Sequence, residues 1–290
     1  MSQTTNRAFN SVHGKSCCVR NKKQSPHILI TINKNIMEES LKEDFESMTR
    51  LYHFTRFETA LLIVKSGKLR FSKLFAMNDI CESNKQIYNN MSSCNQGWFT
   101  NEISKEISRY RQISMTMDKE GKLGFDLTQM WGHYANNGYG VCLVFDKTAI
   151  ERICKSKSIK YGEVLYDEET SLCTRTDVQN KKEIIEYVRN NADSLFFHKR
   201  KEWESEQEFR YIKRCAKTKD CFLDIKKALK YVIMCNSQSQ SSEDSITGST
   251  EYAIMKDVLR TGNIPILQYT YFLDNCQLVC EDSLVWSSDE

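Results

Sequence analysis

The feature that most constrains the fold is a mixture of short strand-like and helix-like segments that runs from residue 51 to residue 280. Helical periodicity predicts helices near residues 56–66, 126–138, 147–155, 181–197 and 251–260. Alternation and short apolar runs predict strands near residues 51–55, 69–71, 113–117, 139–145, 159–166, 203–213, 229–235, 264–272 and 277–280. Because the two kinds do not alternate as regular βαβ units, the order predicts an α+β body.

Composition limits the class of protein further. The 290 residues are 40% hydrophobic and 27% charged, and only 2 are Pro. These values exclude a wholly disordered chain and a Pro-rich or collagen-like one. No apolar run reaches the roughly 18 residues of a membrane span, so we expect no membrane partner.

Charge is distributed unevenly along the chain. Residues 1–36 hold six basic residues and no acidic one, which leaves 35 basic against 38 acidic residues in the remainder. We predict a basic, disordered arm followed by a short helix over residues 1–48, and a single domain over 49–290. A slightly acidic body gives no overall electrostatic reason to bind nucleic acid, although the basic arm could do so.

The twelve cysteines are scattered, with no Cys-x-x-Cys pair, and the N-terminus has no apolar segment of signal-peptide type. This pattern predicts reduced thiols in a cytoplasmic protein. The five His residues do not supply metal-ligand spacing beside them, so we expect no metal site.

Two segments place aromatic and polar side chains together. In a strand over residues 52–55, His53 and Thr55 share one face and could hold a ligand, although an ordinary surface histidine is the plainer interpretation. On the helix that we expect to begin with Asp126 as its N-cap, Trp131, His133 and Tyr134 could stack a planar ring. The plainer interpretation there is core packing.

A third segment concentrates charge. If residues 203–211 are extended, Glu204, Glu206, Glu208 and Arg210 share one face. Carboxylates two residues apart can act on a sugar ring, one holding a hydroxyl and the other stabilising positive charge. Arg210 could bind pyrophosphate or neutralise one of these acids. The alternative is a solvated edge strand.

Taken in order, these segments resemble a bacterial family catalogued as domain of unknown function 2971, over roughly residues 51–279. The matching pieces are residues 51–55, 66–72, 78–79 with Glu82, 130–135 followed by 140–142, Trp203 with Glu206, Glu208, Phe209 and Arg210, and 263–266. That family in turn resembles the ADP-ribosyltransferase superfamily in fold.

This resemblance implies a split, strongly bent β core flanked by helices around a cleft that binds NAD as a substrate. It assigns His53, as a catalytic and NAD-binding residue, to the ribose or nicotinamide of NAD, and Tyr134, with Trp131, to stacking on the nicotinamide. We also expect Thr55, Asn78 and His133 to contact NAD. Glu208 is then the carboxylate acting on the nicotinamide ribose, with Glu206 beside it, and Arg210 is a further cofactor contact.

The function implied is an NAD-dependent ADP-ribosyltransferase or NAD glycohydrolase that cleaves the nicotinamide–ribose bond. The acceptor would be protein, nucleic acid or water, and the setting a bacterial toxin or phage-defence effector. Two alternatives stay open: an inactive module of the same fold that binds a nucleotide or a protein, and an ADP-ribosyltransferase acting on nucleic acid.

Overall fold

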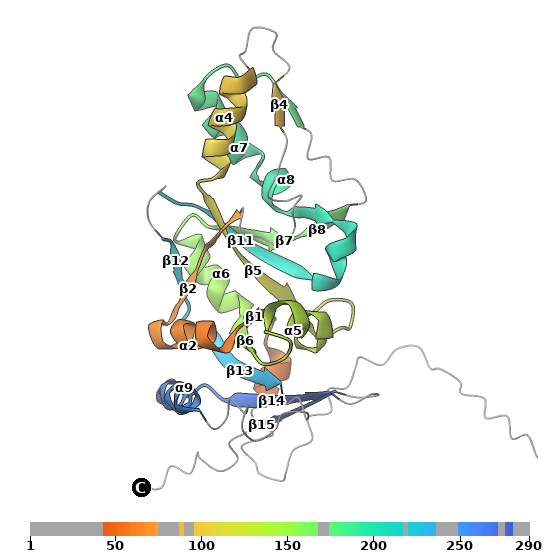
Figure 1. Cartoon of the computed structure of the whole chain (residues 1–290), viewed down its shortest axis with the longest axis vertical. Helices are drawn as coiled ribbons and strands as arrows, with labels where there is room; N and C mark the ends of the chain where they lie inside the picture. The colour runs from red at the N-terminus through yellow and green to blue at the C-terminus, as the bar shows by residue number, and fades with distance from the viewer. Residues whose placement is uncertain are drawn as a thin grey trace, which may run out of the picture.

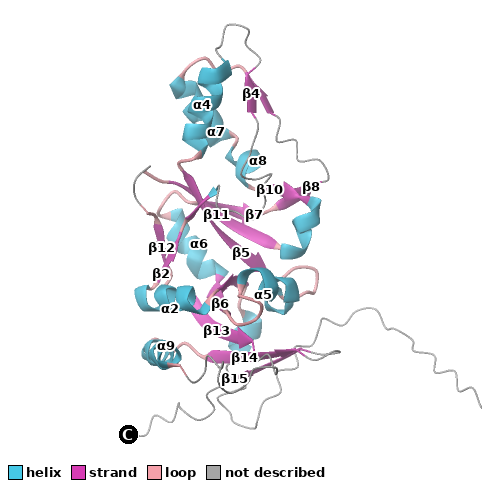
Figure 2. Cartoon of the chain, in the orientation of Figure 1, coloured by secondary structure: helices cyan, strands magenta, loops and turns pink. Residues whose placement is uncertain are grey.

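The computed structural model of the chain is shown in Figures 1 and 2. It describes residues 43–74, 87–89, 96–167, 174–216, 220–235, 249–271 and 276–280. The predicted basic arm over residues 1–36 and the candidate residue Asn78 lie outside these ranges. Residues 43–47 are helical, and Phe45 within them is buried.

The centre of the fold is a nine-stranded mixed sheet, which confirms the α+β class (Figure 2). Its order is β15-β14-β13-β6-β1-β5-β11-β7, with β3 also beside β5, and only β13 and β14 pair in parallel. The bounds of these strands are β1 Arg50–Thr55, β3 Ser72–Lys73, β5 Tyr110–Met117, β6 Val141–Asp146, β7 Lys160–Glu163, β11 Glu208–Arg214, β13 Leu229–Cys235, β14 Ile266–Tyr271 and β15 Cys276–Cys280.

Three pairs of short strands lie outside this sheet. They are β2 Lys68–Arg70 with β12 Phe222–Asp224, β4 Ile87–Asn89 with β9 Thr174–Thr176, and β8 Leu165–Asp167 with β10 His198–Arg200. Figure 1 shows β2 and β12 side by side next to α2, and β8 close to the end of β7.

Helices cover the sheet on both faces and at its end. Leu51, Leu143 and Phe209 belong to a core that also contains residues of α2 Phe57–Ser66, α6 Lys147–Lys155 and α9 Thr250–Thr261. Tyr52 and Phe54 belong to a second core, with Met130 and Trp131 of α5 Thr128–Tyr134. A third core joins α4 Gln96–Ile107, α7 Lys181–Asn190 and α8 Ala192–Phe196 to one end of β5 and β11.

Several predicted boundaries are confirmed because local chemistry fixes them. Helix α2 ends at Gly67, whose φ of 61° is in the left-handed region that favours glycine. Asp146 ends β6 and caps α6, since its carboxylate accepts a hydrogen bond from the N–H of Ala149. Helices α6 and α9 lie within one residue of their predicted ranges.

Three expectations about local structure are wrong. The helix expected over 181–197 is divided into α7 and α8 at Asn191. Residues Lys201–Glu206 form a 3₁₀ helix, η3, instead of the first half of a strand, and Gln207 then has a φ of 48° before β11 starts. Asp126 lies in a second 3₁₀ helix, η2 Gly124–Asp126, and accepts a hydrogen bond from Tyr269 instead of capping α5.

The cysteine prediction is wrong at one pair. Cys215 and Cys221 are joined by a disulfide, although no sequence spacing pointed to it. The pair lies just beyond β11 and just before β12, where the two chain segments come within a Cα–Cα distance of 6.5 Å. Cys142, Cys154 and Cys235 are free thiols.

Candidate functional site

The candidate site lies where one edge of β5 changes partner. Strand β1 pairs with β5 only at Leu51–Met117 and Tyr52–Thr116. At the other end of the same edge, β3 pairs at Ser72–Gln112 and Lys73–Arg111. In the described part of the chain, residues 113–115 have no ladder partner on this edge, and the gap leaves room for a side-chain-lined pocket.

A cavity of about 270 Å³ opens at this gap. Its lining comes from β1, β2, β3, β5, α5, β10, η3 and β11, so segments far apart in the sequence meet there. The lining residues are Tyr52, His53, Phe54, Arg70, Ser72, Gln112, Ile113, Ser114, Met115, Thr116, Met130, Tyr134, Lys199, Glu206 and Glu208.

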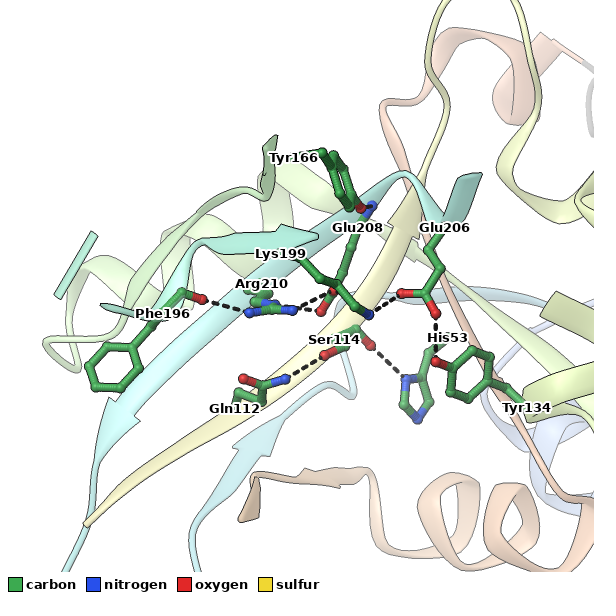
Figure 3. Close-up of polar contacts among 10 residues, drawn as sticks. All are labelled: His53, Gln112, Ser114, Tyr134, Tyr166, Phe196, Lys199, Glu206, Glu208 and Arg210. Atoms are coloured by element: carbon green, nitrogen blue, oxygen red, sulfur yellow. Dashed lines mark hydrogen bonds and ion pairs between the residues drawn. The ribbon is translucent and has the colours of Figure 1, made fainter. Parts of the chain in front are cut away.

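His53 fills the position where the ladder between β1 and β5 is interrupted. Its Nδ1 lies 3.1 Å from the backbone oxygen of Ser114 (Figure 3). A carbonyl only accepts, so Nδ1 carries the proton and donates it. Burial lowers the pKa of His53 although the bond to Ser114 partly offsets this. The imidazole is therefore neutral at pH 7, and its Nε2 has a free lone pair.

Glu208 and Arg210 form a buried ion pair on β11. Arg210 donates to both Glu208 oxygens, at 2.6 and 2.7 Å, and to the backbone oxygen of Phe196 at 2.8 Å. Burial alone would raise the pKa of Glu208, but the charge and hydrogen bonds of Arg210, with Lys199 and Ser114, lower it to about 2. Glu208 is therefore a carboxylate at all physiological pH values.

Lys199 connects the two carboxylates of the cavity. Its Nζ lies 2.6 Å from Glu206 Oε2 and 3.5 Å from Glu208 Oε2 (Figure 3). The ammonium also lies 4.5 Å from the centre of the Trp203 ring. Lys199 is only 4% exposed, so these contacts replace the water that a free ammonium would hold.

Tyr134 completes a row of contacting polar side chains, which consists of Arg210, Glu208, Lys199, Glu206 and Tyr134. Its hydroxyl donates to Glu206 Oε1 at 2.7 Å, so Glu206 receives a neutral donor on one oxygen and a cation on the other. Figure 3 shows the Tyr134 ring beside His53, across from the Arg210–Glu208 pair. The charges of Arg210, Lys199, Glu206 and Glu208 cancel, which explains how four ionic groups are tolerated in a buried site.

Smaller polar groups align this row with β5. Gln112 Nε2 donates to Ser114 Oγ at 3.0 Å, and the N–H of Glu208 donates to the Tyr166 hydroxyl at 2.9 Å. Thr116 Oγ1, which also lines the cavity, is buried and has no hydrogen-bond partner among the described residues. A buried hydroxyl without a partner costs stability.

Part of the chain that forms this site matches a known protein family. Residues 130–211 match a family described as protein of unknown function (DUF2971). The match shows what this segment is similar to, and it covers less than half of the chain. No curated protein and no solved structure matches the chain.

The DUF2971 segment contains Tyr134, Lys199, Glu206, Glu208 and Arg210, and thus the complete charged row. The other side of the cavity, formed by β1, β2 and β5, comes from residues before the match. The predicted family resemblance is therefore confirmed over the segment that supplies the carboxylates.

The structure brings four of the predicted site residues together. His53, Tyr134, Glu206 and Glu208 all line the cavity. His133 is exposed and does not line it, and Thr55, which is buried beyond His53 on β1, does not line it either. These two positions therefore do not fit the predicted contact with a ligand in this cavity.

The predicted cofactor contacts at Trp131 and Arg210 do not agree with the structure. Trp131 stacks on Tyr269 at 5.5 Å between ring centres, and its Nε1 donates to the backbone oxygen of Phe125. It is thus a core residue, which was the plainer interpretation. Arg210 is 1% exposed and neutralises Glu208, so it is not available to a pyrophosphate.

The sequence interpretation missed Lys199, Gln112, Ser114 and Arg70. Lys199 stands in a basic run, His198-Lys199-Arg200-Lys201, that looks like any solvated surface. The available signal was its position before the acidic segment, because buried carboxylates need a nearby cation. Gln112 and Ser114 alternate with apolar residues of β5, which marks them as sharing one face.

Two further findings concern the described residues as a whole. None of their helices is long and apolar enough to cross a bilayer. In the same ranges, no group of three or more His, Cys, Asp and Glu side chains is placed to hold a metal ion.

Proposed function

We propose that the cavity binds the nicotinamide–ribose end of NAD and that the protein cleaves the bond between them, as an ADP-ribosyltransferase or NAD glycohydrolase. The observation that supports this most is the convergence of His53, Tyr134 and two carboxylates on one cavity at the interrupted pairing of β1 and β5. The cavity is smaller than the roughly 300–1,000 Å³ typical of ligand pockets, so it suits one end of a dinucleotide.

Cleavage places positive charge on the ribose as the neutral nicotinamide leaves. A carboxylate close to that sugar stabilises the charge, as in glycoside hydrolysis. We assign this role to Glu206 instead of Glu208. Both Glu208 oxygens accept hydrogen bonds from Arg210, whereas one Glu206 oxygen accepts only from the neutral Tyr134 hydroxyl, which a ribose hydroxyl can join or displace.

The other residues position the substrate. His53 is neutral and fixed by Ser114, so its Nε2 can accept a hydrogen bond from the ribose or from the nicotinamide amide. The Tyr134 ring lines the cavity, where we propose that the flat nicotinamide stacks on it. Lys199 holds the Glu206 carboxylate in position through its ammonium, and Glu208 with Arg210 in turn supports Lys199.

A specific observation favours a second candidate. Each carboxylate is within hydrogen-bond distance of a buried cation, which reduces the negative potential that a developing cation would meet. A module that binds a nucleotide or a protein without cleaving NAD would keep the same geometry. For the enzyme, the acceptor is protein, nucleic acid or water, and we propose a cytoplasmic toxin or phage-defence effector as its setting.

Nicotinamide release from NAD tests the proposal. We expect release by the wild-type protein and a loss of about 10²–10³-fold in Glu206→Gln, the size found when one preorganised electrostatic group is removed. Glu202→Gln is the matched control, because Glu202 is exposed on the same 3₁₀ helix and does not line the cavity.

Calorimetry with NAD separates the two candidates. Binding without release would favour the nonenzymatic module. If nicotinamide release is unchanged in Glu206→Gln but reduced in Glu208→Gln, the catalytic carboxylate is Glu208. Absence of both binding and release would reject NAD as the ligand.

A further inference from the structure

Of the three cationic side chains in or next to the cavity, one is not neutralised by a carboxylate. Arg210 and Lys199 are neutralised by Glu208 and Glu206. Arg70 also lines the cavity but is exposed, and its guanidinium has no ion pair or hydrogen bond among the described residues. A ligand in the cavity therefore meets a net positive charge at Arg70, and that favours an anionic group.

Strand pairing places an aromatic side chain directly beside this guanidinium. In the antiparallel pair of β2 and β12, Arg70 is opposite Phe222. Directly opposite residues share a face, with Cβ atoms about 4.5–5.5 Å apart. Phe222 is 45% exposed, while its neighbour Leu223 is buried opposite Leu69 on the other face. Figure 1 shows β2 and β12 side by side at the edge of the fold.

Arg70 lies at the outer side of the cavity, because it lines the cavity and is exposed to solvent. Because Arg70 lines the cavity and stands on the outer face of β2, a ligand that extends past Arg70 reaches the Phe222 ring next. The other charged pair on this face, Lys68 opposite Asp224, is balanced in charge and lies one pair further along the strands. It adds no net repulsion to an anion at Arg70.

We infer that Arg70 and Phe222 form a nucleotide subsite, in which Arg70 binds phosphate and Phe222 stacks a purine or pyrimidine base. Arginine is suited to phosphate because its planar fork donates two parallel hydrogen bonds, and a base stacks on an aromatic ring irrespective of its identity. The inference rests on the proposed function, since a cavity that holds only the nicotinamide–ribose end of NAD leaves the ADP portion to be bound outside it.

Calorimetry with ADP, AMP, adenosine and inorganic pyrophosphate tests the subsite without requiring the inner cavity or any reaction. We expect the Kd for ADP to rise about tenfold or more in Arg70→Gln, the usual size of a lost hydrogen bond to a charged group. We expect a similar rise in Phe222→Ala, from lost stacking. Arg70→Gln should leave adenosine binding unchanged, and Phe222→Ala should leave pyrophosphate binding unchanged.

Exposed residues away from the cavity provide matched controls. Arg260→Gln on α9 removes an exposed guanidinium, and Leu62→Ala on α2 removes a side chain that is 69% exposed. Both should bind ADP as the wild type does. Because all four substitutions are at exposed positions, circular dichroism should show folded proteins, and a binding change then reports on the ligand.

Two results would overturn the inference: no ADP binding by the wild-type protein, or equal ADP affinity in Arg70→Gln, Phe222→Ala and the controls. Nicotinamide release measured on the same preparations keeps the two proposals distinct. ADP binding that depends on Arg70 without any NAD cleavage supports the subsite and rejects the enzyme. NAD cleavage with a KM unchanged in both variants supports the enzyme and rejects the subsite.

Discussion

Replacing Arg210 by Met should be among the most damaging changes to this site, although Arg210 does not line the cavity. The side chain is 1% exposed, donates two hydrogen bonds to Glu208 and one to the backbone oxygen of Phe196. Met retains much of the apolar stem but no donor. Glu208 is then left with Lys199, whose nearest approach is 3.5 Å and which is closer to Glu206.

The size of the effect follows from the ionisation of Glu208. A carboxyl whose pKa falls from 4.5 to about 2 on folding stabilises the folded state by about 3 kcal/mol above pH 4.5. Removing one partner of a buried ion pair costs about 3–5 kcal/mol, because the other charge stays buried. The wild-type contribution is fully present above pH 4.5 and is lost as the pH falls toward 2, so the deficit of Arg210→Met should shrink over that window.

Urea unfolding of four proteins measures this coupling. They are the wild type, Arg210→Met, Glu208→Gln and the double variant, each at pH 7 and at pH 3. At pH 7 the double variant should be more stable than the sum of the single losses predicts, by about 2 kcal/mol or more. A coupling free energy below about 0.5 kcal/mol, or a deficit of Arg210→Met that does not decrease at pH 3, would refute the reasoning.

Three further predictions concern residues around the cavity. Trp131→Ala should lose about 3–5 kcal/mol of unfolding free energy, by thermal or urea unfolding, because it removes a buried ring that stacks on Tyr269. His53 should titrate below its ordinary pKa of 6.5 by NMR, and since its neutral form is favoured on folding, the stability that it contributes should fall as the pH drops below 6.5. Lys199→Met should lower nicotinamide release, because Glu206 then lacks the ammonium that holds it in place; release at the wild-type rate would contradict this role.

Strands and helices with strong local signals could be predicted from the sequence. The 51–55 and 229–235 strands and the 147–155 helix were found because their apolar periodicity agrees with how they are buried. Gly67 marked a helix end because only glycine adopts the left-handed conformation there at little cost. Local and tertiary preferences coincide in these segments.

The failures arose where tertiary contacts override local pattern. Alternation over residues 203–213 predicted one strand, but the chain forms a 3₁₀ helix to Glu206, and Gln207 turns it into β11. Trp131 has the spacing of a ring-stacking residue, and only its contacts with Tyr269 and Phe125 show that it is core. In a segment where aromatic and polar residues alternate closely, as around Trp131, the sequence pattern does not specify which side chains meet the core.

The candidate site was predicted in part for a similar reason. Imidazole, aromatic and carboxylate residues could be selected by type, and His53, Tyr134, Glu206 and Glu208 do share one cavity. The residues that form hydrogen bonds and ion pairs with them could not be predicted from the sequence. The contact of Lys199 with Glu206, for example, depends on how β10 and η3 pack together. Our proposal that Glu206, instead of Glu208, acts on the ribose rests on these partners and not on the spacing of the two residues.

The most direct measurement is a crystal structure of the Glu206→Gln protein soaked with NAD. The account predicts electron density for the nicotinamide beside Tyr134 and His53, its ribose at residue 206, and the phosphates toward Arg70. Density for NAD at another surface, with this cavity holding only solvent, would contradict the central claim.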